Sequence, residues 1–114
     1  MSERFGADAR LRTRADYQRT DSARRVSGRY VTLVGRPNGR DQDRLGIVAS
    51  RKIGGAVVRN RAKRRVRELF RRRPAHAGAP LDVVAIARSG LSDAPFAELQ
   101  SDFLAALSKL RGAR

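Results

Sequence analysis

The residues best suited to do chemistry are cations that follow a two-glycine turn in the segment Arg51–Arg73, RKIGGAVVRNRAKRRVRELFRRR. Between Arg59 and Arg73 there are nine Arg or Lys residues and one acid, Glu68. Like charges this close repel one another, and a single carboxylate cannot neutralise them. We therefore expect a polyanion outside the chain to bind here, with nucleic acid as the first candidate. The alternative is a solvated basic face with no partner.

The same segment has the apolar spacing of an amphipathic helix. At about 100° per residue, one apolar stripe is formed by Val58, Ala62, Val66, Leu69 and Phe70. The facing arc carries Asn60, Lys63, Arg64, Arg67 and Arg71, and the flank beside Glu68 carries Arg61, Arg65 and Arg72. The helix is thus predicted to pack on a core, to present its cations outward, and to end near Arg73 because Pro74 follows.

Composition indicates a single domain, residues 1–114, with a strongly uneven charge. The 114 residues carry a formal charge of +15, and residues 1–73 hold 22 basic and 7 acidic groups whereas residues 74–114 hold 4 of each. The polyanion is therefore expected on the N-terminal two-thirds. The chain has no cysteine, no run long enough to span a membrane and no apolar stretch typical of a secretory signal, so a cytoplasmic protein is expected.

The elements that must position these cations are predicted in the order α-β-β-α-β-α, an α+β fold. A first helix is expected from Thr13 to about Arg24, and residues 1–12 are predicted to be flexible outside a core of about 13–111. Strands are predicted at Arg29–Gly35, Arg44–Ser50 and Leu81–Ala87, the last of them buried on both faces. Tyr30, Thr32 and Val34 are expected on one face of their strand. A last helix is predicted to be capped by Ser92 or Asp93, with Pro95 in its first turn.

No catalytic constellation is apparent. The only histidine, His76, lies among small residues, and the carboxylates are scattered without metal-ligand spacing. Gly54 and Gly55 precede a helix but lack the GxxxxGK pattern of a nucleotide-binding loop, so a simple turn is favoured. We predict no catalytic residue and no metal ligand in this chain.

The residues Ala49–Glu68, ASRKIGGAVVRNRAKRRVRE, closely resemble the SRK, AV and RNRxKRxxRE motif of the bacterial ribonuclease P protein component. Asp82–Arg88 is similar to the strand that follows the motif in that family. The resemblance implies a small two-layer sandwich, of the type found in a domain of a ribosomal protein, with a mixed sheet and a left-handed β-α-β crossover. It also implies the protein subunit of a ribonucleoprotein endonuclease that removes the 5′ leader of precursor tRNA. In that family the hydrolysis is carried out by a catalytic RNA with Mg²⁺, and the protein alone holds no cofactor.

The resemblance also assigns partners and site residues. A protein monomer is expected in a 1:1 complex with the catalytic RNA, which it contacts through Arg51, Lys52, Arg59, Asn60, Arg61, Lys63, Arg64 and Arg67. Arg59 lies beside the apolar stripe, so its stem is alternatively expected to pack there. The leader is expected in a cleft between the first helix and the sheet, where Tyr17 and Tyr30 would stack on unpaired bases. The alternative for both tyrosines is core packing with the hydroxyl at the rim.

Two positions depart from the family pattern, since Asp21 stands where many members have a second aromatic on the first helix and Leu33 where some have one on the strand. Arg19 and Arg25 are alternative contacts that would hold the leader through its phosphates. Two rival functions remain: a purely structural RNA-binding protein, such as a ribosomal protein, and a nuclease that acts without RNA.

Overall fold

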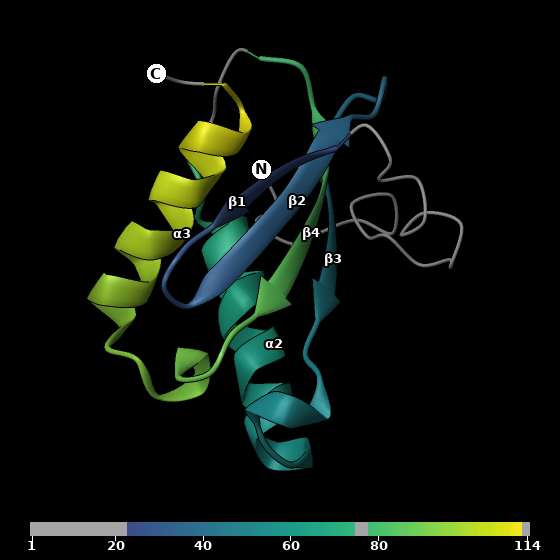
Figure 1. Ribbon diagram of the computed structural model, residues 1–114. Coiled ribbons are helices and arrows are strands. Elements are labelled where there is room, and N and C mark those ends of the chain that lie inside the picture. The colour runs from purple at the N-terminus through teal and green to yellow at the C-terminus, as the bar shows by residue number, and fades with distance from the viewer. Residues whose placement is uncertain (1–22, 75–77, 113–114) are drawn as a thin grey trace.

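Four strands form one mixed sheet in the order β1-β2-β4-β3 (Figure 1). The computed structural model describes residues 23–74 and 78–112. The strands are β1 (Arg24–Ser27), β2 (Val31–Pro37), β3 (Arg44–Val48) and β4 (Leu81–Ala87). β2 pairs antiparallel with β1 and β4, whereas β3 and β4 are parallel. The basic helix α2 (Ala56–Arg71) connects these two parallel neighbours, and α3 (Phe96–Leu110) follows β4.

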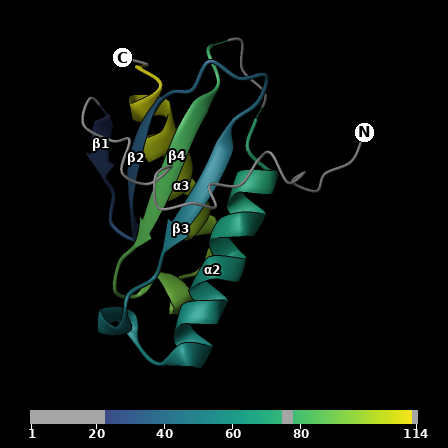
Figure 2. The ribbon, with the colours of Figure 1, turned by 90° about the vertical axis from the view of Figure 1, so that its right-hand side faces the viewer.

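Both helices share one core with one face of the sheet (Figures 1 and 2). A side chain at Gly35 of β2 would meet Leu110 of α3 at 2.7 Å, so α3 packs directly on this strand. The fully buried core joins sheet residues to both helices: Leu33, Val83, Val66, Phe70, Leu99 and Phe103. The predicted α+β sandwich of two layers is therefore confirmed.

The central strand β4 is buried on both faces, as its apolar sequence predicts. Because successive side chains alternate, Val83, Ala85 and Ala87 contribute to the helix-covered core, whereas Val84 and Ile86 face the other way. By the strand register, Thr32 and Val34 of β2 share this second face. This second face is called below the face opposite α2 and α3.

The edge strand β1 was not predicted from the sequence, which indicated a helix through about Arg24. Arg24–Ser27 instead pairs with β2, with Val26 opposite Leu33. The segment RRVS has a single apolar residue, so no alternation marks it as a strand, and its pairing depends on the neighbouring β2. The rest of the predicted first helix lies outside the described residues. In the described part of the chain the order is therefore β-β-β-α-β-α.

The other boundaries lie close to the predicted ones, with one correction at α3. Ser92 and Asp93 do not cap α3 but lie in a short 3₁₀ turn, η3 (Leu91–Asp93), and the N-cap position is Pro95. Ala94 is extended (φ −63°, ψ 144°), as steric contact with a following proline ring favours. The helix therefore begins only after the proline.

Candidate nucleic-acid interface

Helix α2 packs its apolar stripe against the sheet and leaves the opposite arc toward solvent. Ala62, Val66, Leu69 and Phe70 are buried. On the facing arc Asn60, Arg64 and Arg67 are exposed and Lys63 is half-buried, and Arg61 on the flank is also exposed. The spacing of the sequence thus predicted the orientation of this helix correctly.

Four of the nine cations between Arg59 and Arg73 are used inside the protein. Arg65 donates from Nη1 to the carbonyl oxygens of Leu91 (2.8 Å) and Ser92 (3.0 Å), and from Nη2 to that of Ala94 (2.7 Å). Arg71 and Arg72 both pair with Glu68, and Arg73 pairs with Asp43. These four side chains therefore have partners within the protein, including Arg71, which helical spacing placed on the facing arc.

The remaining cations on α2 form the candidate interface. Arg61, Lys63, Arg64 and Arg67 make no side-chain hydrogen bond or ion pair with any described residue, and neither does Asn60. Arg59 is half-buried, and its Nε is buried without a hydrogen-bond partner in the described structure. Its stem therefore packs beside the apolar stripe, which was the alternative expected for this residue.

The two-glycine turn adds two more cations at the start of α2. Arg51 and Lys52 lie exposed in a 3₁₀ turn, η2 (Arg51–Ile53), which the Gly54 N–H closes by donating to the Arg51 carbonyl oxygen (3.2 Å). Gly54 has φ +145°, and a side chain there would meet Val58 at 2.8 Å, so only glycine fits. This turn places two exposed cations shortly before the N-terminus of the helix.

Comparisons with known proteins identify the family. A sequence model of the family Ribonuclease P matches residues 5–111. The chain belongs to the ribonuclease P protein family. Members are components of a ribonucleoprotein endoribonuclease with a role in tRNA 5′ processing.

Individual relatives agree in sequence and in structure. The chain is 33% identical over 102 residues to the ribonuclease P protein component of Syntrophomonas wolfei, covering 89% of this chain and 86% of the relative. It is 42% identical over 106 residues to that of Pseudomonas paraeruginosa, covering 90% and 78%. The solved RNase P protein of Staphylococcus aureus superimposes with a TM-score of 0.77 at 32% identity, covering 89% and 94% of the two chains. That of Thermotoga maritima gives 0.75 at 34% identity, covering 92% and 97%.

One of the two tyrosines that the family resemblance assigned to the leader packs against α3. Tyr30 is 8% exposed, its hydroxyl donates to Glu98 Oε1 (3.1 Å) and its N–H donates to Asp102 Oδ2 (2.9 Å). The prediction that it shares a face with Thr32 and Val34 is wrong, because it precedes β2 and strand alternation does not apply to it. The pKa of the Tyr30 hydroxyl is raised mainly by burial and also by the hydrogen bond to Glu98. This geometry is that of the core-packing alternative, whereas Tyr17 lies outside the described residues.

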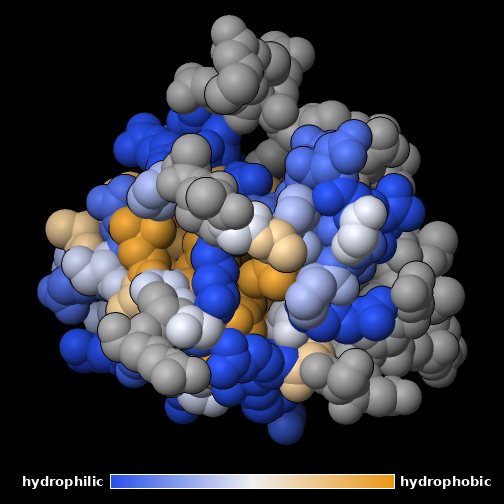
Figure 3. Space-filling view, turned by 90° about the horizontal axis from the view of Figure 1, so that it is seen from above, coloured by the Kyte–Doolittle hydropathy of each residue, from blue (hydrophilic) through white to orange (hydrophobic). Residues whose placement is uncertain are grey.

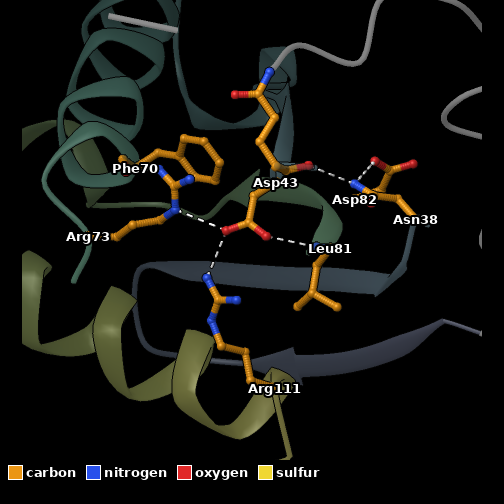
Figure 4. Close-up of polar contacts among 8 residues, drawn as sticks. Asn38, Asp43, Phe70, Arg73, Leu81, Asp82 and Arg111 are labelled. Carbon is orange, nitrogen blue, oxygen red and sulfur yellow. Dashed lines mark hydrogen bonds and ion pairs between the residues drawn. The ribbon is translucent and has the colours of Figure 1, made fainter. Parts of the chain in front are cut away.

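Two of the carboxylates that are scattered in the sequence, Asp43 and Asp82, are buried and bound by arginine side chains. Asp43 is 6% exposed and accepts from the Leu81 N–H (2.7 Å), Arg73 Nε (3.0 Å) and Arg111 Nη2 (2.9 Å), as Figure 4 shows. It thereby ties the ends of both helices to the start of β4. Figure 3 looks onto this end of the molecule, where hydrophilic side chains lie between apolar areas.

The second carboxylate, Asp82, is also 6% exposed. It accepts two hydrogen bonds from Arg44, at Nε (2.8 Å) and Nη2 (2.7 Å), and one from Asn38 Nδ2 (3.0 Å). Burial by itself raises the pKa of Asp82, but the bonds from Arg44 and Asn38 outweigh it and lower the pKa overall. Such a carboxylate is a poor general base, because its proton affinity is low and its oxygens are occupied.

The described residues 23–74 and 78–112 contain no group of three or more His, Cys, Asp or Glu side chains that could hold a metal ion. None of the helices in these ranges is long and apolar enough to cross a membrane. His76, the only histidine, lies outside the described residues.

Proposed function

We propose that the exposed arc of α2, together with η2, binds the catalytic RNA of ribonuclease P. The contacts would be Arg51, Lys52, Arg59, Asn60, Arg61, Lys63, Arg64 and Arg67. The observation that carries this proposal is the division of the nine cations between Arg59 and Arg73. Four are held by groups within the protein, while the other five have no described partner. Arginine side chains on such a surface bind phosphates in pairs of hydrogen bonds and release condensed counterions.

In this proposal the protein supplies binding, and the RNA with its Mg²⁺ ions supplies the hydrolysis. The two buried carboxylates, Asp43 and Asp82, support this division because each is occupied by guanidinium groups. The protein would act in the cytoplasm as a monomer bound to one RNA subunit. It would itself hold no metal or other cofactor.

We further propose that the 5′ leader of precursor tRNA lies on the face of the sheet opposite α2 and α3. Arg25 of β1 is exposed and pairs in register with Val34, so a cation stands at the edge of this face. It would hold the leader through phosphates, while Tyr17 is the tyrosine retained for stacking on a base. Because the ring of Tyr30 packs against α3, a leader contact of Tyr30 would require that packing to open.

Reconstitution tests the proposed function directly. The purified chain is added to the catalytic RNA and precursor tRNA at low Mg²⁺, and both cleavage rate and affinity for precursor and mature tRNA are measured. We expect faster cleavage and a gain in affinity for the precursor over mature tRNA. No gain in either quantity would contradict the proposal, and cleavage by the protein without RNA would favour the rival self-sufficient nuclease.

A further inference from the structure

The first turn of α2 carries an apolar side chain on the side that faces away from the core. Val57 is 82% exposed, and Val48 at 39% is the only other exposed large hydrophobic residue that the structure describes. Val57, Arg61 and Arg64 are spaced four and three positions apart, which aligns them on one side of the helix. A single exposed valine is ordinary on protein surfaces. This one, however, lies in line with the cations that face away from the core.

The residue that precedes this turn is a glycine that the fold does not require. Gly55 has φ −76°, which any residue can adopt, and a side chain built there would meet nothing within 4 Å. Its neighbour Gly54 is the opposite case, since its φ and the contact with Val58 both demand glycine. Gly55, Ala56 and Val57 are all exposed, and together they form a bare surface, called below the Gly55–Val57 shelf.

The charges around the shelf determine what could cover it. Arg51 and Lys52 lie exposed in η2 just before it, Arg61 and Arg64 follow it on the helix, and the first turn of α2 holds no acidic residue. An apolar surface bordered in this way suits a ligand with a flat apolar face and negative charges on both sides. A nucleotide with an unstacked base in an RNA chain has this form.

We propose that an unpaired base of the catalytic RNA lies on the Gly55–Val57 shelf. The base would contact the Val57 methyl groups with one face, and its neighbouring phosphates would be bound by the surrounding cations. Gly55 would be needed because a side chain at that position would occupy the space of the base. This inference rests on the proposed RNA-binding function and adds to it a contact that does not depend on salt.

Two substitutions test the shelf with little effect on folding. Val57→Thr keeps the shape of the side chain but buries a hydroxyl under the base, and we expect the affinity for the catalytic RNA to fall about fivefold. Gly55→Ser places a favourable N-cap residue before α2, so the melting temperature should stay equal or rise. The same serine would intrude on the base and lower the affinity about tenfold.

The measurement is a titration of the full chain with its cognate catalytic RNA at several salt concentrations, with melting curves for each variant. We expect both variants to lower the affinity by a constant factor without changing the slope of log K against log[salt]. Ala97→Ser, an exposed change in the first turn of α3, serves as the control and should leave the affinity unchanged.

If the parent chain binds the catalytic RNA tightly and both variants bind it equally tightly, the base contact on the shelf is disproved while the proposed function stands. If the parent chain does not bind the RNA, both proposals fail.

Discussion

At the scale of single residues, the cations of α2 differ in what neutralises them, and this difference can be measured. Arg64 is exposed without a described partner, whereas Arg72 pairs with Glu68 and lies over the Phe96 ring at 5.7 Å. If about four to six phosphates are engaged, log K for the catalytic RNA should fall with log[salt] at a slope of about −3 to −5. Arg64→Ala should make this slope shallower by about 1, and the matched variant Arg72→Ala should leave it unchanged. Equal slopes for parent and Arg64→Ala would remove Arg64 from the interface.

The sequence could predict which residues face solvent, but it could not predict which of them remain available. Helical spacing alone orients Asn60, Arg64 and Arg67 correctly. The acceptors that bind Arg65 and Arg73, however, come from residues 91–94 and from Asp43, which are distant in sequence. Distant acceptors of this kind leave no periodic signal in the sequence.

At the scale of elements, Arg65 links α2 to the connection between β4 and α3, in addition to the apolar packing of the helix. Its guanidinium group binds three carbonyl oxygens, those of Leu91, Ser92 and Ala94. Arg65→Ala should lower the free energy of unfolding by about 2–3 kcal/mol, because these charge-assisted hydrogen bonds are lost. Urea unfolding measures this as a lower midpoint at an unchanged m-value.

Two variants separate this docking role from simple loss of charge. Arg65→Lys should recover part of the stability, since an ammonium group cannot reproduce the planar set of donors. Arg61→Ala removes the same charge from an exposed position, so its stability should lie within about 0.5 kcal/mol of the parent. Comparable destabilisation by Arg61→Ala and Arg65→Ala would show that net charge, not docking, governs the stability of α2.

The elements themselves were predictable to the degree that each carries its own pattern. β4 has a continuous apolar run and α2 a complete apolar stripe, and both were predicted with nearly correct bounds. β1 has neither, because an edge strand with Arg24, Arg25 and Ser27 exposed needs only Val26 for the core. Its existence follows from pairing with β2, which is a tertiary property.

At the scale of the whole molecule, Asp43 links both helices to the sheet, and this makes stability depend on pH. Burial by itself raises the pKa of Asp43, but hydrogen bonds from the Leu81 N–H, Arg111 and Arg73 outweigh it and lower the pKa overall. A carboxyl whose pKa is lower in the folded chain stabilises that state fully above its unfolded pKa of about 4. This stabilisation is lost as the pH falls through the folded pKa, and protonation of Asp82 acts in the same direction.

Asp43→Asn measures the share of this effect that belongs to one carboxylate. Asparagine can still accept from the Leu81 N–H, but it leaves Arg73 and Arg111 without their charged partner, so we expect a loss of about 2–3 kcal/mol at pH 7. Below about pH 5 the parent should lose stability more steeply than the variant, and the two curves should converge. Unfolding titrations from pH 7 to pH 2 at constant ionic strength give both curves.

Acidification protonates the carboxylates and raises the net positive charge of both proteins, which is already +15 in the parent, so electrostatic repulsion grows in both. Only the difference between the two stability curves therefore reports on Asp43. A difference that stays constant with pH would mean that the Asp43 carboxylate does not hold the two helices through its charge.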